Sequence, residues 1–167
     1  ILHYTNKSSF IYHFSLKLVN NLFLFLSNEI CCTSFNEYIE HTGDVNAAYY
    51  LNFYTDVMKY RLKISLKYKE SELSDDANII IMEYFDKETS LFEGFIIDGI
   101  KTNSKILEIN EFKKEFFDDA LEVAYENLEK KYFEFKESNE FNYLLEKLNI
   151  IANLQCKMFH TGLIQNN

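Results

Sequence analysis

The sequence has no proline and no tryptophan, and only four of its 167 residues are glycine. Proline and glycine are the residues that most often form β-turns, hairpin connections and long loops. Their scarcity favours helices joined by polar connectors. The 47% hydrophobic content, which includes sixteen phenylalanines and twelve tyrosines, is sufficient for the core of one domain. We therefore predict an all-α fold.

Cysteine is also scarce, with Cys31 and Cys32 adjacent and Cys156 far away. This odd number forms neither the even framework of a secreted disulfide protein nor a C-x-x-C pair, so a reducing, intracellular compartment is expected. The histidines are scattered without the spacing of metal ligands: His3, His13, His41 and His160. No Ser-His-Asp or Cys-His spacing is present. We expect no metal, no cofactor and no enzyme active site.

Basic residues are few, since 17 Lys and Arg face 26 Asp and Glu, which gives a net charge of −9. This charge repels phosphate backbones and anionic lipid, so nucleic acid is not an expected partner. The longest apolar segment, Phe10–Leu26, is short for a membrane span and includes a histidine, a lysine and two asparagines. We predict a buried helix there. A cytoplasmic location is expected, with any membrane attachment supplied by other parts of the full-length protein.

Apolar residues recur at helical spacing in the first half of the chain. The spacing predicts a short helix over 33–41 and a long one over 45–69, separated by a break in which Gly43 can take a positive φ. Ser74 is predicted to cap the next helix, because the pair Asp75-Asp76 would then lie in the first turn and oppose the helix dipole.

The helical pattern weakens over 86–110, where we expect a loop with at most one short helix. A clear apolar stripe follows, formed by Phe117, Leu121, Ala124, Leu128, Tyr132 and Phe135. The pair Asp118-Asp119 is expected at the start of that helix. Ser138 is predicted to cap the last helix.

Five segments combine aromatic and aliphatic residues in one order. They are FNEYIE at 35–40, LNFY at 51–54, ANIIIMEYF at 77–85, FDDA at 117–120, and the set Tyr132, Phe135, Ser138, Tyr143 and Leu144. Their order and separation resemble the regulator of G-protein signalling (RGS) family. The family pattern is F-x-x-F/Y-L, L-x-F-W/Y, A-x-x-I-Y-x-x-F, F-D-x-A and a final Y-x-x-F-L-x-S-x-x-Y-x-x-L. About one residue is missing before Tyr132.

The resemblance implies a nine-helix fold, with a four-helix bundle and a second lobe formed by the N- and C-terminal helices. It places the RGS-like domain at 24–160, an N-terminal helical extension at 1–23 and a polar tail at 161–167. Family members that accelerate GTP hydrolysis hold a Gα subunit with the loops after the third, fifth and seventh helices. They stabilise its transition state without adding catalytic groups.

The corresponding loops of this chain depart from the family's Gα contacts. Tyr50 stands where the family has an asparagine. In the second loop, the family has an asparagine that orients the glutamine of the Gα switch region, and the stretch Gly94 to Ile97 has no amide side chain. Lys131 and Glu134 reverse the charges of an acidic and an arginine position. Reversed charges can reject a partner, so ordinary Gα recognition is not expected.

We therefore predict an RGS-like docking or scaffolding domain of intracellular signalling or trafficking, with a protein partner. The predicted partner interface comprises Thr42, Asp44, Asn46, Tyr49, Tyr50, Gly94, Ile96, Asp98, Lys131 and Glu134. Two alternatives stay open. The chain could be a GTPase-activating regulator of a G protein, or an unrelated helical bundle with a small-molecule pocket.

Overall fold

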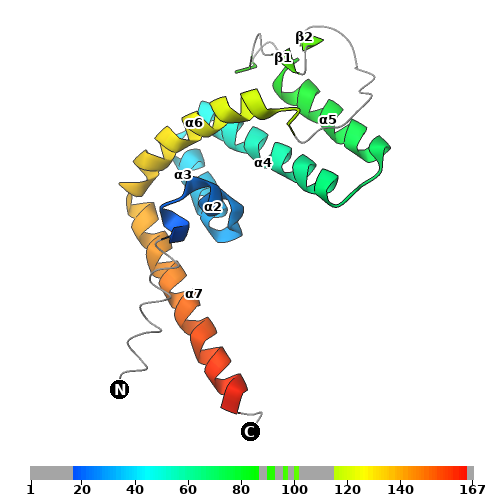
Figure 1. Ribbon diagram of the computed structural model, residues 1–167. Coiled ribbons are helices and arrows are strands. Elements are labelled where there is room, and N and C mark those ends of the chain that lie inside the picture. The colour runs from blue at the N-terminus through cyan, green and yellow to red at the C-terminus, as the bar shows by residue number, and fades with distance from the viewer. Residues whose placement is uncertain (1–16, 87–89, 93–95, 98–99, 102–114, 165–167) are drawn as a thin grey trace. The chain divides into compact units, whose positions relative to one another are not determined.

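The computed structural model describes residues 17–86, 90–92, 96–97, 100–101 and 115–164 (Figure 1). The helices are α2 (Leu22–Ser27), α3 (Glu29–Thr42), α4 (Val45–Ser65), α5 (Glu70–Tyr84), α6 (Asp118–Lys136) and α7 (Asn139–Ile164). Two short antiparallel strands, β1 (Ile96–Ile97) and β2 (Ile100–Lys101), pair Ile96 with Lys101 and Ile97 with Ile100. Apart from this strand pair, the described part of the chain is helical, which confirms the predicted all-α class.

The chain divides into two compact units. The terminal unit joins the two chain ends, 1–42 and 131–167, and the central unit runs from 43 to 130. Helix α6 contributes its first part to the central unit and its last turns to the terminal unit. The predicted boundaries after residues 23 and 160 stay predictions.

The core of the central unit is built around Phe53 on α4. Its ring is fully buried and lies 4.5–6.3 Å, between ring centroids, from the rings of its aromatic neighbours. These neighbours are Tyr84, Phe85, Phe92 and Phe117. Such edge-to-face and tilted contacts add to the free energy gained by burying the rings.

Helix α4 begins and ends at residues that fix the backbone. Gly43 has a φ of +66°, and the Asp44 Oδ1 atom then accepts a hydrogen bond from the Ala47 backbone N–H at 2.9 Å. The helix ends at Ser65, earlier than the predicted Lys69, because Lys67 takes a positive φ of 58° that a right-handed helix does not allow.

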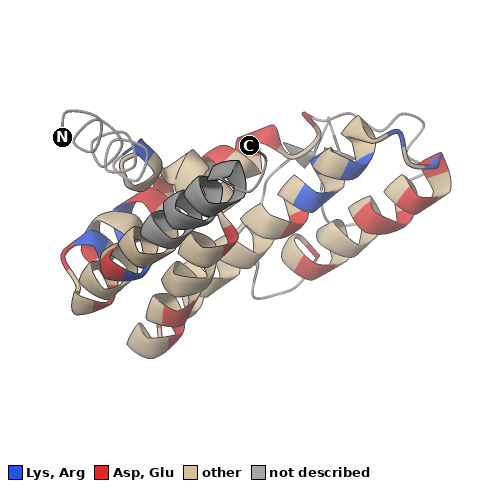
Figure 2. Cartoon of the chain, turned by 90° about the horizontal axis from the view of Figure 1, so that it is seen from below, with Lys and Arg blue, Asp and Glu red and all other residues tan. Residues whose placement is uncertain are grey.

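The predicted start of α5 at Ser74 is wrong. The helix begins at Glu70, so Ser74 lies inside it, and Glu70 and Glu72 supply the acidic first turn. Asp76 does not act at a helix start either, since its carboxylate lies 2.6 Å from the Lys63 Nζ atom of α4. Figure 2 shows that the charged residues along α5 are acidic.

In the terminal unit, two asparagines set the helix starts. The Asn21 Oδ1 atom accepts a hydrogen bond from the Leu24 N–H at 3.0 Å, and the Asn28 Oδ1 atom accepts one from the Cys31 N–H at 3.1 Å. The Asn21 hydrogen bond starts a new helix at Leu22 and so interrupts the helix predicted over 10–26. Residues 10–16 of that prediction lie outside the described part. The Asn28 hydrogen bond starts α3 at Glu29, four residues before the predicted beginning at residue 33.

Phe135 on α6 is the centre of the terminal core. It is fully buried, and the centroids of its aromatic neighbours lie 5.1–6.4 Å away. These neighbours are Phe25, Phe35, Tyr38, Tyr132 and Phe141. The predicted cap of the last helix is confirmed, because the Phe141 N–H donates to the Ser138 Oγ atom at 3.2 Å.

The apolar stripe of α6 is confirmed as well. Each of its predicted members is buried, and Asp118 and Asp119 lie in the first turn. In the segment expected to be a loop with at most one short helix, the described residues instead include the pair β1 and β2, which fits the β-branched isoleucines there. No helix in the described part of the chain is both long and apolar enough to cross a membrane.

Candidate functional site

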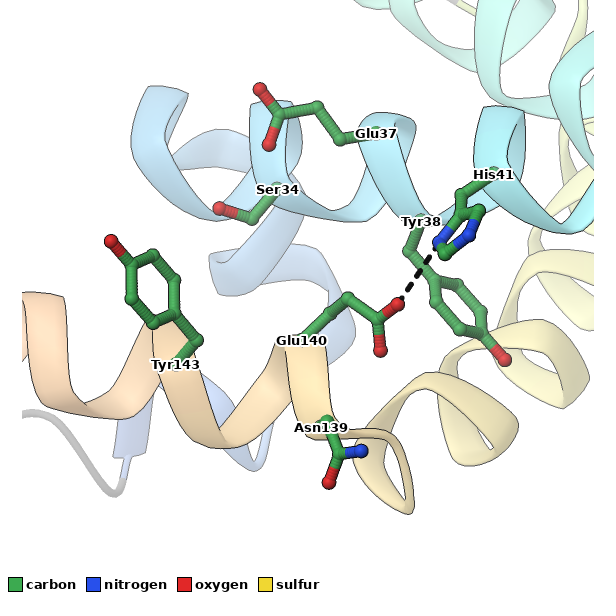
Figure 3. A pocket seen from close by; sticks show the side chains of 7 residues that line it. All are labelled: Ser34, Glu37, Tyr38, His41, Asn139, Glu140 and Tyr143. Atoms are coloured by element: carbon green, nitrogen blue, oxygen red, sulfur yellow. Dashed lines mark hydrogen bonds and ion pairs between the residues drawn. The ribbon is translucent and has the colours of Figure 1, made fainter.

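An open groove of about 460 Å³ lies between α3 and α7 in the terminal unit (Figure 3). Its lining residues are Ser34, Glu37, Tyr38 and His41 from α3, and Asn139, Glu140 and Tyr143 from α7. The α3 residues share one face, because they lie at i, i+3, i+4 and i+7. Beneath the groove, Phe35 of α3 and Phe141 of α7 both pack on Phe135, which fixes the two helices side by side.

One end of the groove carries a hydrogen-bonded pair that the fold assembles from distant residues. The His41 Nδ1 atom lies 3.1 Å from the Glu140 Oε1 atom, across 99 positions of sequence (Figure 3). Several hydrogen bonds lower the pKa of the Glu140 carboxyl, first from its own backbone N–H and then from His41 and Ser138. Glu140 is therefore held as a carboxylate at the N-terminal turn of α7.

The aromatic residues of the groove differ in exposure. Tyr38 is half-buried, with its ring centroid 5.1 Å from that of Phe135 and the Lys131 Nζ atom 5.5 Å from the ring. Tyr143 is 72% exposed and lies toward the same end as Ser34 (Figure 3). One tyrosine thus builds the wall, and the other presents its ring to a partner.

The chemistry of the groove favours a cationic group on a partner. Glu37 and Glu140 contribute carboxylates, and Tyr143 contributes an exposed ring that attracts a cation or packs on an aliphatic stem. Within the described part of the chain, its lining includes no lysine or arginine. Because the groove is open to solvent and not an enclosed cavity, it suits a segment of another macromolecule better than an enclosed small molecule.

The predicted interface residues of the central unit lie at the start of α4. Asp44 caps the helix, and Asn46 is exposed. The Tyr49 hydroxyl donates to the Tyr84 carbonyl oxygen at 2.6 Å, and its ring lies against those of Tyr84 and Phe92. Tyr50 is half-buried beside Phe92, and burial raises its pKa. Both tyrosines thus contribute to the packing of the central unit.

The predicted interface residues of the terminal unit are Thr42, Lys131 and Glu134. The Thr42 Oγ1 atom donates to the Ile39 carbonyl oxygen at 3.0 Å. The Lys131 Nζ atom lies 2.9 Å from the Glu134 Oε2 atom, so the two charge-reversed positions pair with each other on α6. These three residues are not among those that line the groove.

The remaining predicted interface residues are Gly94, Ile96 and Asp98. Ile96 belongs to β1, whereas Gly94 and Asp98 lie outside the described residues. The structure therefore brings the predicted residues near the start of α4 together, and separately the pair on α6. The exposure of Gly94, Ile96 and Asp98 lies outside what the structure describes.

The groove itself was missed at the sequence level. In the sequence His41 is only one of four scattered histidines, because Glu140 is remote from it along the chain. A partial signal was present, since Ser138 was correctly predicted as a cap, and a cap places Glu140 in a first helical turn. Its partner across the groove could be identified only from the packing of α3 against α7.

The cysteines fit a structural role better than a reactive one. Cys31 is buried, and burial together with the neighbouring Cys32 raises its thiol pKa to about 12, while burial also raises the pKa of Cys32. A thiol with a raised pKa is a poor nucleophile at neutral pH. Among the residues that the structure describes, no three His, Cys, Asp or Glu side chains gather as they would to hold a metal ion.

Comparison with protein-family models, with curated proteins and with solved structures found no match to this chain.

Proposed function

We propose that this chain is an RGS-like docking domain that binds a protein partner and does not activate the GTPase of ordinary Gα subunits. The observation that carries the docking function is the open groove between α3 and α7. It combines two carboxylates with exposed aromatic surface, and this combination receives a segment with a lysine or arginine.

Burial supports the family part of the proposal. The apolar positions that match the RGS pattern share a core location. They are Phe35, Ile39, Leu51, Phe53, Tyr54, Ala77, Ile80, Ile81, Tyr84, Phe85, Phe117, Ala120, Tyr132, Phe135 and Leu144. Two matched tyrosines are exceptions: Tyr38 is half-buried and Tyr143 is exposed, and both line the groove. The terminal unit also combines both chain ends, as the implied second lobe would.

The ion pair on α6 supports the loss of Gα recognition. The Lys131 ammonium group is held by Glu134 at 2.9 Å and lies over the Tyr38 ring. A Gα surface that complements the family's charges would meet the opposite sign at both positions. It would also have to displace an existing intramolecular pair, which adds to the cost of binding.

A charge swap tests this proposal. In the double variant Lys131→Glu and Glu134→Arg, the i,i+3 pair is kept in reverse order and the family's signs are restored. We expect the wild-type chain neither to bind Gα·GDP·aluminium fluoride nor to accelerate single-turnover GTP hydrolysis. The swap should raise affinity for that complex at least about tenfold, measured by biolayer interferometry. The matched control exchanges the exposed neighbours Glu146 and Lys147 of α7.

Each result has a defined meaning. GTP hydrolysis accelerated by the wild-type chain contradicts the proposal and establishes the GTPase-activating alternative. If the charge swap and its control have equal affinity for the Gα complex, the RGS family assignment is wrong. The chain is then a helical docking domain of another kind.

Photo-crosslinking tests the groove directly. A benzophenone amino acid at Tyr143 should crosslink one protein partner in extracts of the source cells, whereas the same group at exposed Asn142 of α7 should not. Glu140→Gln should reduce the Tyr143 product several-fold, because the carboxylate that meets the cation is lost. Glu146→Gln on the same helix should leave it unchanged. Equal products from positions 142 and 143 would contradict a docking role for the groove.

A further inference from the structure

The outward face of α5 exposes two large apolar side chains at its centre. Ile79 is 63% exposed and Met82 is 61% exposed. At 100° per residue, positions 72, 75, 79, 82 and 83 fall within an arc of about 100°. The buried residues of α5 lie on the opposite side, where the helix packs against α4: Leu73, Ala77, Ile80, Ile81 and Tyr84.

Carboxylates flank this apolar centre. Glu72 and Asp75 precede Ile79 on this face and Glu83 follows Met82, and all three carboxylates are exposed. The stretch Glu70–Asp86 has no lysine, arginine or histidine. The face itself therefore carries only negative charges around an apolar strip, and Lys63 of α4, which pairs with Asp76, lies near Glu72.

We infer that this α5 face, formed by Glu72, Asp75, Ile79, Met82 and Glu83, docks a basic amphipathic helix of a protein partner. The apolar stripe of such a helix would cover Ile79 and Met82, and its lysines or arginines would pair with the flanking carboxylates. Recognition of an amphipathic helix uses anchors at this helical spacing. Methionine suits the purpose, because its flexible side chain adapts to the partner's surface.

The charge pattern argues against other occupants of the α5 face. A second copy of this chain would bring the same carboxylates and another net charge of −9, so the two faces would repel each other. Anionic lipid and nucleic acid carry the same sign. The inference depends on the central unit alone and is independent of the RGS assignment and of the groove.

A model peptide tests the inference. The probe is a five-turn amphipathic peptide of leucine on one face and lysine on the other, and the matched probe replaces lysine with glutamate. Fluorescence anisotropy with the full chain should detect binding of the leucine–lysine peptide only. The affinity should fall as salt rises, because exposed charge pairs are screened.

Two double variants locate the binding surface. Ile79→Ser with Met82→Ser should weaken peptide binding about tenfold. The control, Leu62→Ser with Leu66→Ser, removes equally exposed leucines (58% and 61%) at the end of α4, where lysines neighbour them, and should leave the affinity unchanged. Glu72→Gln with Asp75→Asn should weaken binding and flatten its salt dependence.

Three results would overturn the inference. They are equal losses in the two serine variants, binding of the leucine–glutamate peptide, and a chain dimer in analytical ultracentrifugation that Ile79→Ser with Met82→Ser abolishes. Circular dichroism of each variant confirms that a loss of binding is not a loss of helix. Since the substituted residues are exposed, the fold should be retained.

Discussion

At the scale of single residues, Glu140 combines three hydrogen bonds in the first turn of α7. Its own backbone N–H, His41 and Ser138 all stabilise the carboxylate, and together they lower its pKa below the ordinary value of 4.5. A group whose pKa is lower in the folded state stabilises the fold above its ordinary pKa. That contribution is lost as the pH falls through the lowered value.

His41→Ala should therefore raise the pKa of Glu140 part of the way toward 4.5. The rise is only partial because the backbone N–H, which is the largest cause, is retained. Carbon-detected NMR titration of the side-chain carboxyl measures it directly. The stability of the variant should depend less on pH in the acidic range than that of the wild type.

His41→Gln is the matched control, since its amide can still donate to the Glu140 carboxylate. It should hold the pKa of Glu140 below the value in His41→Ala. A Glu140 pKa that is identical in the wild type and in His41→Ala would show that the contact in Figure 3 is not populated in solution.

At the scale of helices, the sequence was sufficient where one periodic stripe agreed with a local cap. The α6 stripe and the Ser138 cap are examples, because both depend on residues within a few turns of each other. Phe135, the last member of the predicted stripe, is fully buried.

Helix boundaries were less predictable where several residues could act as caps. Ser74 with its two aspartates carries the pattern of a helix start, yet Glu70 and Glu72 give the same acidic first turn four residues earlier. Asn21 and Asn28 were overlooked because they lie inside or beside an apolar run. In each case competing local hydrogen bonds decide the boundary, and periodicity does not distinguish between them.

The α5 face could be identified largely from the sequence, whereas the groove between α3 and α7 could not. The acidic character of the α5 face follows from a stretch without basic residues, and helical spacing gives the exposed positions. The groove requires α3 and α7 to pack together through rings that both contact Phe135. Only tertiary packing brings His41 to Glu140, so no local pattern predicts the site.

At the scale of the whole molecule, the groove and the α5 face share one electrostatic preference. Each places carboxylates beside apolar or aromatic surface, and the net charge of −9 adds a long-range attraction for cations. The surfaces belong to different units, so each can be inactivated separately. A partner that needs both would lose affinity with either set of substitutions.

The division into units also predicts which helices lose stability when a core residue is truncated. Phe135→Ala removes a fully buried ring whose aromatic neighbours all belong to the terminal unit. We expect a loss of about 3–5 kcal/mol in the free energy of unfolding. Hydrogen exchange should accelerate most in α2, α3 and α7, and less in α4 and α5.

Phe133→Ala provides the control, because Phe133 lies two residues away on α6 and its ring is exposed. Its removal should change the free energy of unfolding by no more than about 0.5 kcal/mol. Denaturant unfolding followed by circular dichroism measures both variants, and mass spectrometry locates the exchange. If Phe135→Ala accelerated exchange equally in α4 and α5, the two units would unfold as one, and the terminal core would stabilise the whole chain rather than its own unit.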